Sequence, residues 1–329
     1  MQDQKSSSSI FSFKNGPFGF FKQALVFFVP VLLIFALAEL MILQIPFNYT
    51  ITSDYFKNHH DEIEILALGP SQTNSAINPK YLSNPAISLA STAQHHGLDF
   101  NILKQTRDRL PNLKYVILEL SYSHLELPHN SDNFWKNAVY LKYYNVNAFG
   151  RNTYFKDKLI YLSNPDIYSK KLIDHYFIGI KEPNYNKYGF NESDFEGSFK
   201  SLDYNETSIS KIHNFRINTT TDIDLFTKNT QFLFEMLDYC KSEKLNVVVC
   251  TMPLYKTYLK KRNPDILRRR DSILQIISVK YDNLRLFNKE TDTVNFSASD
   301  FINQNHLNPK GAEKFSKALN LLINREFNN

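Results

Sequence analysis

Residues 115–120 read Tyr-Val-Ile-Leu-Glu-Leu, and the prediction of the fold starts from them. Five of these six side chains are apolar or aromatic, which is typical of a strand buried on both faces of a sheet. Shorter apolar runs occur elsewhere in the chain, at residues 63–68, 86–89, 246–250 and 284–287. Helical patterns separate or follow these runs, near residues 98–110, 231–243, 266–281 and 309–325.

This alternation of short apolar runs and helical patterns indicates a parallel sheet that is covered by helices on both faces. We therefore expect an α/β fold with a five-stranded parallel sheet in a three-layer, flavodoxin-like arrangement. Ligands of such sheets bind beyond the carboxyl ends of the strands. Catalytic or binding side chains are accordingly expected directly after each predicted strand.

Residues 125–224 interrupt the alternation. They are rich in Tyr, Asn and Lys and contain few long apolar runs. A segment of this length is too long for an ordinary loop of a compact domain. The sequence predicts a helical and irregular insertion that lies over the mouth of the sheet.

An apolar stretch near the N-terminus predicts a membrane anchor. All residues from 24 to 38 are apolar, and residues 20–46 as a whole suffice for a helix that crosses the hydrocarbon core. Lysines precede this stretch and acidic residues follow it closely, which predicts a cytoplasmic tail over residues 1–19 and export of the remaining chain. Glu39 is expected at the outer interface or against a partner helix. A cleaved signal peptide is the alternative, but no small-x-small cleavage site follows the stretch.

Composition excludes several classes of protein. The chain of 329 residues has a net charge of +5 but no basic arm or RNA-binding signature, so we expect no nucleic-acid partner. Its two cysteines exclude a disulfide scaffold and a multi-cysteine zinc site. Adjacent histidines such as His95 and His96 point apart on a helix or strand, so we expect neither a metal nor another cofactor.

A serine follows the first predicted strand. Residues 69–73 read Gly-Pro-Ser-Gln-Thr, and a tight turn there would direct the Ser71 hydroxyl into the cleft. A hydroxyl becomes a good nucleophile only when a base accepts its proton. His306 precedes the last predicted helix and is the candidate base at the same edge of the sheet.

These two segments carry a resemblance to a known family. Gly-x-Ser after the first strand, with His-Leu-Asn-x-x-Gly-Ala at residues 306–312, resembles the SGNH (GDSL-type) hydrolase superfamily. A closer likeness is to its membrane-anchored bacterial envelope branch, which includes alginate O-acetylation proteins and the D-alanine transfer protein of teichoic acids. That likeness is carried by residues 66–73, 77–79, 88–94 and 113–122. We thus expect an SGNH-like domain over residues 61–329.

The resemblance implies a role for each matching residue. Ser71 would be the nucleophile and His306 the general base, and Asn303 stands where the superfamily has its aspartate, three residues before the histidine. Backbone amides of Ser71 and of the Ala90 region would form the oxyanion hole. A polar side chain after the third strand, Ser121, would join the oxyanion hole, and Gln94 would line the pocket.

The expected function is that of a single-pass, membrane-anchored serine acyltransferase or esterase with its catalytic domain in the periplasm or outside the cell. It would act on acyl groups, acetyl foremost, of a cell-envelope polysaccharide through a Ser71–His306 acyl-enzyme. Its expected partners are an acylated glycan or acyl donor, the membrane, and a multi-pass membrane protein that exports acyl groups.

Two departures from the superfamily pattern, Pro70 and Asn303, leave a second hypothesis open. In that hypothesis the chain is a catalytically degenerate SGNH-fold binding or scaffold protein of an envelope glycan assembly system. Asp300, six residues before His306, is the alternative source of a carboxylate.

Overall fold

The computed structural model describes residues 16–130 and 134–327. These residues form two compact units. The larger unit consists of Pro46–Lys158 and Lys181–Asn329, and the smaller unit combines the chain up to Ile45 with Leu159–Ile180.

The larger unit contains a five-stranded parallel sheet with the strand order β2-β1-β3-β4-β5. All five predicted strands are present, and their ends lie within two residues of the predicted ones. The strands are β1 (Ile65–Ala67), β2 (Ala86–Ser88), β3 (Tyr115–Glu119), β4 (Asn246–Thr251) and β5 (Leu284–Asn288). The prediction of an α/β fold with a five-stranded parallel sheet is therefore confirmed.

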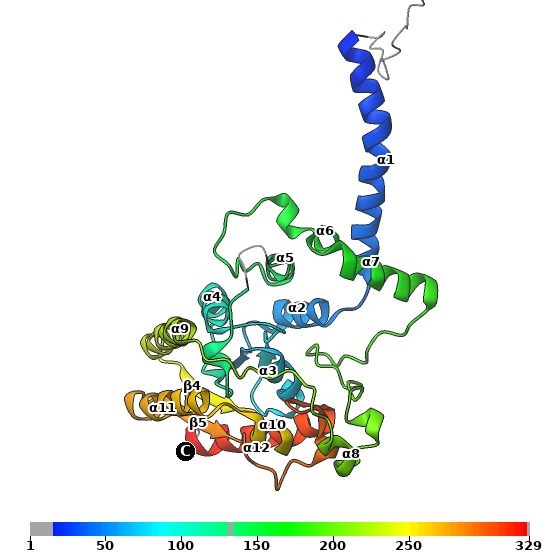
Figure 1. Cartoon of the computed structure of the whole chain (residues 1–329). Coiled ribbons are helices and arrows are strands. Elements are labelled where there is room, and N and C mark those ends of the chain that lie inside the picture. Colours follow the sequence, from blue (N-terminus) through cyan, green and yellow to red (C-terminus); the bar gives the residue numbers. More distant parts are fainter. Residues whose placement is uncertain (1–15, 131–133, 328–329) are drawn as a thin grey trace, which may run out of the picture. The chain divides into compact units, whose positions relative to one another are not determined.

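Helices pack on both faces of this sheet (Figure 1). Alternate residues of β3 belong to two different hydrophobic clusters, Val116 and Leu118 to the first and Tyr115 and Ile117 to the second. The first cluster includes side chains of α4 (His96–Thr106), α9 (Ile223–Ser242) and α11 (Pro264–Lys280). The second includes side chains of α3 (Ser71–Ala76) and α12 (Pro309–Phe327).

The N-terminus of one helix differs from the predicted one because of a capping side chain. The helix predicted to begin at Gln231 begins at Ile223 in α9. Asp222 sets this start, because its side-chain oxygen accepts a hydrogen bond from the backbone N–H of Leu225 at 2.9 Å. α12 begins at Pro309, as predicted.

The described residues of the predicted insertion, 125–130 and 134–224, form short helices and irregular segments, apart from the first two residues of α9. In the larger unit these are η3 (His124–Glu126), α5 (Lys136–Val139), η4 (Tyr140–Tyr144), η5 (Phe155–Lys158), η7 (Lys200–Leu202) and α8 (Glu206–Ser210). Further elements of this unit are α2 (Asn48–His59), η1 (Pro79–Tyr81), η2 (Arg107–Arg109), α10 (Lys256–Lys261), η8 (Ala298–Asp300), β6 (Phe301–Asn303) and β7 (His306–Leu307).

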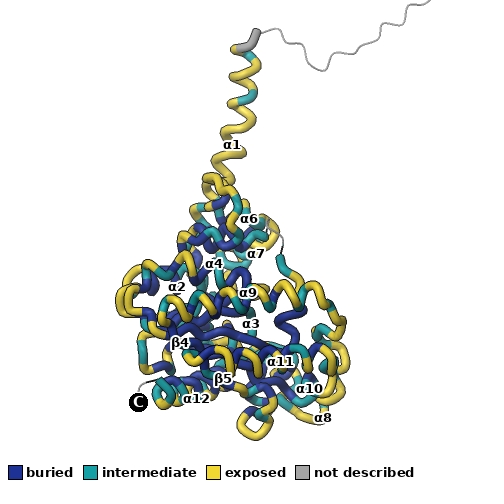
Figure 2. Tube along the Cα trace, turned by 90° about the vertical axis from the view of Figure 1, so that its left-hand side faces the viewer, coloured by how far each residue is buried: buried dark blue, intermediate teal, exposed yellow. Residues whose placement is uncertain are grey.

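The smaller unit is built on one long helix, α1 (Gly16–Gln44). Packed with it are α6 (Ile160–Ser163), α7 (Pro165–Ile173) and η6 (Asp174–Ile178). Within the described part of the chain, Phe18–Gln44 is the one helix that is long and apolar enough to cross a membrane, with a mean hydropathy of 2.7. Most of α1 is exposed, in contrast to the largely buried strands of the sheet (Figure 2).

Candidate active site

The turn after β1 places Ser71 at the start of a helix. Gly69 has a φ of +137°, and a Cβ there would lie 2.3 Å from Thr73 Oγ1 and 3.3 Å from Glu119 Cβ. Only glycine fits such a position. Pro70 follows with an extended conformation at φ −78°, close to the angle that its ring imposes. The departure at Pro70 is thus compatible with the turn that presents Ser71.

A small hairpin before α12 holds His306. β6 and β7 form an antiparallel pair in which Asn303 lies opposite His306. Asn308 then caps α12, since its side-chain oxygen accepts from the backbone N–H groups of Lys310 and Gly311 at 3.0 and 3.1 Å. A Cβ on Gly311 would lie 2.2 Å from the backbone oxygen of Asp300. The His-Leu-Asn-x-x-Gly spacing is therefore explained by local packing around the histidine.

The structure brings Ser71 and His306 together, although 235 positions separate them in the chain. His306 Nε2 lies 2.8 Å from Ser71 Oγ, a normal hydrogen-bond distance. A second contact ties the two segments, because Gln72 Nε2 donates to the backbone oxygen of Asn305 at 3.0 Å. These two contacts connect the turn that carries Ser71 with the hairpin that carries His306.

Asn303 orients the imidazole. Its Oδ1 accepts hydrogen bonds from the backbone N–H groups of Asn305 and His306, both at 3.0 Å, which identifies this atom as the amide oxygen rather than the nitrogen. The same oxygen lies 3.1 Å from His306 Nδ1. Nδ1 must therefore carry the proton, and the lone pair of Nε2 faces the Ser71 hydroxyl. Asn305 Oδ1, also 3.1 Å from Nδ1, supports this tautomer.

What this arrangement lacks is a charge beside the imidazole. Burial lowers the pKa of His306 to about 4, so the ring is neutral near pH 7. Asp300, the alternative carboxylate, is fully buried, and its Oδ2 accepts from Lys314 Nζ at 2.8 Å and from Ser297 N at 2.9 Å. Its described contacts do not include His306. Among the described residues, the hydrogen-bond partners of His306 Nδ1 are the amide oxygens of Asn303 and Asn305, and they include no carboxylate that could stabilise an imidazolium.

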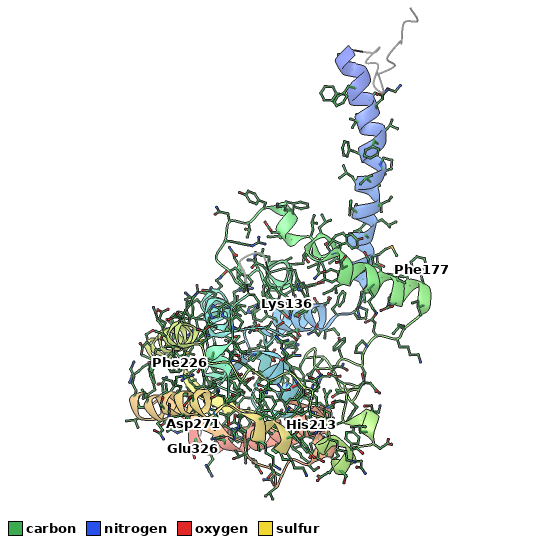
Figure 3. The ribbon with its side chains drawn as sticks, viewed as in Figure 1. Lys136, Phe177, His213, Phe226, Asp271 and Glu326 are labelled. Carbon is green, nitrogen blue, oxygen red and sulfur yellow. The ribbon has the colours of Figure 1, made fainter. Side chains whose placement is uncertain are left out.

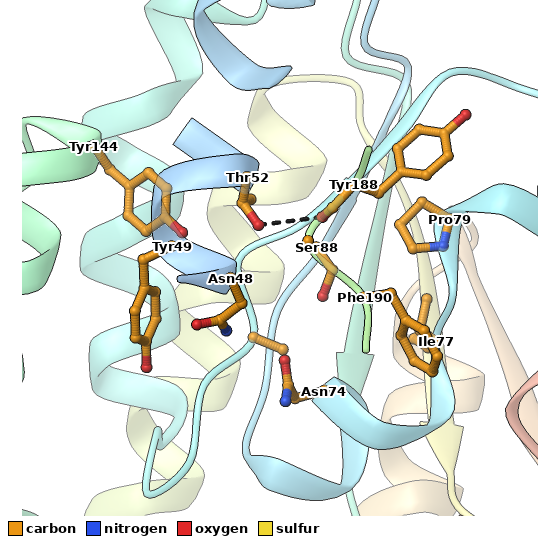
Figure 4. A pocket seen from close by; sticks show the side chains of 12 residues that line it. Asn48, Tyr49, Thr52, Asn74, Ile77, Pro79, Ser88, Tyr144, Tyr188 and Phe190 are labelled. Atoms are coloured by element: carbon orange, nitrogen blue, oxygen red, sulfur yellow. Dashed lines mark hydrogen bonds between the residues drawn. The ribbon is translucent and has the colours of Figure 1, made fainter. Parts of the chain in front are cut away.

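The other predicted site residues lie in different surroundings. Ala90 follows β2 and lines a hollow together with Asn74, one turn after Ser71 (Figure 4). Ser121 follows β3 and lies beside the carboxyl group of Glu119. Gln94 is buried in a polar network, where it donates to Asp99 at 2.6 Å and accepts from Tyr140 at 2.7 Å. Gln94 is not among the residues that line the hollows described here.

A second hollow of about 180 Å³ adjoins the first. The two share Asn48, Asn74, Gly189 and Phe190. Leu307, the neighbour of His306, lines the second hollow, and so do Tyr185, Asn191 and Asp194. Aromatic and polar side chains of the insertion thus line this space together with Asn74 and Leu307, which are close in sequence to Ser71 and His306. Ser71 and His306 themselves are not among the residues that line either hollow.

Glu119 is a residue of this region that sequence reasoning missed. Its side chain is 1% exposed, and its Oε2 accepts from Thr73 Oγ1 at 2.7 Å, directly under the serine turn. Burial raises the pKa of this carboxyl to about 7. The sequence did contain a signal for this residue, because Glu119 is the one acidic residue in the otherwise apolar strand at 115–120.

Four histidines form two stacked pairs. The ring centroids of His95 and His129 lie 3.6 Å apart, and those of His96 and His124 lie 4.2 Å apart. Burial lowers the pKa of His95 to about 3 and that of His96 to about 4. Over residues 16–130 and 134–327, no group of three or more His, Cys, Asp or Glu side chains is arranged to hold a metal ion.

A comparison with protein-family models found none that matches the chain, and a comparison with curated proteins found no match either. The geometry of the site, together with the sequence motifs, is therefore the basis for a functional proposal.

Proposed function

We propose that this chain is a membrane-anchored serine acyltransferase or esterase that acts on acyl groups, acetyl foremost, of a cell-envelope polysaccharide. The observation that carries the proposal is the 2.8 Å contact between Ser71 Oγ and His306 Nε2, in the tautomer that accepts the serine proton. The resemblance of both segments to the SGNH hydrolase superfamily adds support.

The proposed reaction has two steps. Ser71 Oγ attacks the carbonyl carbon of an acyl ester while its proton moves to His306 Nε2. The imidazolium then protonates the departing alcohol oxygen as its bond to the carbonyl carbon breaks, which leaves an acyl-enzyme on Ser71. In the second step a glycan hydroxyl or water attacks this ester, and His306 again receives and returns the proton. Backbone amides of Ser71 and of the Ala90 region would stabilise the oxyanion.

The lining of the hollows supports a hydroxyl-rich substrate. Asn48, Asn74, Asn191 and Asp194 offer donors and acceptors, and Tyr185 and Phe190 offer aromatic surfaces. Such a mixture suits a sugar, which presents hydroxyl groups at its edge and C–H groups on its faces. A glycan acceptor or acylated glycan therefore fits this space better than an extended lipid chain.

The proposal places α1 across the cytoplasmic membrane with the N-terminus in the cytoplasm and the larger unit outside. The length and apolar character of α1 support a single-pass anchor. Transfer from a cytoplasmic donor would need a multi-pass acyl-exporting partner. The strand order and the clusters on both sheet faces favour the flavodoxin-like, three-layer arrangement.

A second candidate function is favoured by one specific observation. Asn303 replaces the aspartate of the superfamily, and burial lowers the pKa of His306 to about 4. Both features weaken the base and are what a binding or scaffold protein that had lost catalysis would show.

Labelling with a fluorophosphonate, which reacts with activated serines, separates the two candidates. We expect the purified full-length protein to be labelled, and Ser71→Ala and His306→Ala to lose the label. Ser278→Ala, an exposed serine on α11, is the matched control and should be labelled like the wild type. Equal labelling of wild type and Ser71→Ala, or no labelling of either, would favour the scaffold function.

A further inference from the structure

The second segment of the smaller unit exposes an unusual amount of apolar surface. Large apolar side chains that are at least two-fifths exposed occur throughout Leu159–Ile180, namely Leu162, Ile167, Ile173, Phe177, Ile178 and Ile180. Phe177, labelled in Figure 3, is 78% exposed, and its neighbour Ile178 is 63% exposed. Soluble surfaces rarely gather side chains of this kind over so short a stretch.

Three residues of α1, Phe35, Glu39 and Met41, hold this segment. The Glu39 carboxylate accepts hydrogen bonds from the first two backbone amides of α6, Oε1 from Ile160 N at 3.0 Å and Oε2 from Tyr161 N at 2.8 Å. The Tyr161 ring packs against Phe35 with centroids 6.0 Å apart. Tyr176 donates its hydroxyl proton to the backbone oxygen of Met41 at 3.0 Å. The segment therefore sits at the level of residues 35–41 of α1.

That level coincides with one end of the apolar span. Lys22 and Glu39 are the ionisable residues of α1, and their separation of 17 positions corresponds to about 26 Å of helix. The hydrocarbon core of a bilayer is about 30 Å thick. With Lys22 near one boundary, Glu39 and the segment attached to it lie at the other. The sequence suggested the interface or a partner helix for Glu39, and amides of its own chain satisfy the carboxylate.

We propose that residues 159–180 form an interfacial collar that inserts its apolar side chains into the membrane boundary at Glu39. The occupant of this surface is lipid, because the exposed apolar side chains of the segment belong to the same compact unit as those of α1, which itself exposes Leu37 and Leu40 next to Glu39. Tyr161 and Tyr176 have the amphipathic rings that are common at this depth. Lysines at positions 156, 158 and 181 flank the collar in sequence and suit anionic headgroups.

The collar gives the chain a second membrane contact beyond the spanning helix. The backbone passes between the two units at three points, after Ile45, before Leu159 and after Ile180. The smaller unit, held in the bilayer by α1 alone, could rotate about the axis of that helix. Insertion of the collar would restrict that freedom, because a second patch of the same unit is then bound to lipid. This inference rests on the proposal that α1 spans a membrane.

Nitroxide labels at single introduced cysteines test the collar in the full-length protein. Both native cysteines, Cys240 and Cys250, are fully buried, which favours selective labelling of Phe177→Cys. Leu33→Cys in α1 reports the span, and Val294→Cys, an apolar site of the larger unit that is 93% exposed, is the matched control. Each protein is reconstituted into phosphatidylcholine–phosphatidylglycerol liposomes, and collisions with oxygen and with a water-soluble nickel chelate are measured.

We expect the labels at 33 and 177 to collide mainly with oxygen, with that at 177 nearer the boundary, and the label at 294 to collide mainly with the nickel chelate. A label at 177 that behaves like the one at 294 overturns the collar while leaving the span intact. A label at 177 that is shielded from both reagents shows a protein surface over it, such as a second copy, and also overturns the collar. A water-exposed label at 33 instead overturns the spanning helix itself.

Discussion

The imidazole of His306 is oriented by amide oxygens where a serine triad would use a carboxylate. Asn303 supplies a hydrogen-bond acceptor at the place where the SGNH superfamily, which this segment resembles, has an aspartate, and two backbone N–H groups prevent its amide from flipping. What it does not supply is a negative charge for the imidazolium. Orientation and charge stabilisation, which one aspartate usually combines, can therefore be examined separately in this protein.

Restoring the charge should accelerate the reaction of Ser71. In Asn303→Asp the carboxylate can accept the same hydrogen bonds, and a bond to a charged partner is roughly 1 to 2 kcal/mol stronger than a neutral one. We expect fluorophosphonate labelling about five- to thirtyfold faster than in the wild type. Asn303→Ala is the control, and it should be slower because the tautomer is no longer held. An unchanged or slower rate in Asn303→Asp would argue against a general-base role for His306.

The pH dependence of labelling should report His306. The ring must be neutral to accept the serine proton, and its pKa is lowered to about 4 by burial. The rate is thus expected to rise with pH through about 4 and to level off above about pH 5. In Asn303→Asp the added negative charge favours the imidazolium, so the midpoint should move upward. The measurement is the labelling rate of both proteins between pH 3.5 and 8, and a wild-type midpoint near the ordinary histidine value would contradict the buried dyad.

The titration of Asp99 should change the free energy of unfolding and not the rate of labelling. Burial raises the pKa of Asp99 from 3.8 to about 8, so the folded state retains a proton that the unfolded state loses. Its stabilising contribution is complete below about pH 4 and is lost as pH rises toward 8, by up to about 1.4 kcal/mol per pH unit.

Asp99→Asn tests this assignment, because an amide keeps an acceptor for Gln94 without titrating. The neighbouring histidines have lowered pKa values and titrate below about 6.5, so the window from pH 6.5 to 8 isolates the acids. Denaturant unfolding should show a decline of stability over this window in the wild type and a shallower one in the variant. Equal slopes would mean that Asp99 is ionised in the folded protein.

At the scale of elements, two turns determine whether the dyad forms. The turn from β1 into α3 requires a residue without a side chain at Gly69, and the hairpin of β6 and β7 presents His306 beside the cap of α12. Both turns lie at the carboxyl side of the sheet, where parallel strands leave space for ligands. The proposed chemistry therefore depends on the few residues of these two turns rather than on the helices and strands that they join.

Substitutions at the neighbouring positions 69 and 70 should differ in their effect on stability and on the labelling of Ser71. Gly69→Ala forces a Cβ to within 2.3 Å of Thr73 Oγ1 at a φ of +137°, which should cost roughly 1 to 3 kcal/mol and abolish labelling of Ser71. Pro70→Ala is the matched control, because any residue tolerates the extended conformation found there. Thermal unfolding and fluorophosphonate labelling of both variants check this, and a Gly69→Ala protein with normal labelling would contradict the described turn.

Across the whole molecule, features that depend on local sequence patterns could be predicted, whereas features that depend on contacts between residues far apart in the chain and have no such pattern could not. The five strands were predictable because each contains a short, mostly apolar run, and the proximity of Ser71 and His306 was predictable because each lies in a recognisable motif. The contact between Glu119 and Thr73 could not be predicted, because the two residues are 46 positions apart, and the start of α9 depended on the Asp222 cap. The packing of residues 159–180 on α1 has no local signature, since it depends on Glu39, more than a hundred positions away.

The most direct test of the account is to look for the acyl group on Ser71. The full-length protein is incubated with p-nitrophenyl acetate, quenched and digested, and its peptides are examined by mass spectrometry. The account predicts an acetyl group on Ser71 of the wild type that is greatly reduced in His306→Ala. Absence of this adduct from the wild type, or its equal presence in His306→Ala, would contradict a serine nucleophile activated by this histidine.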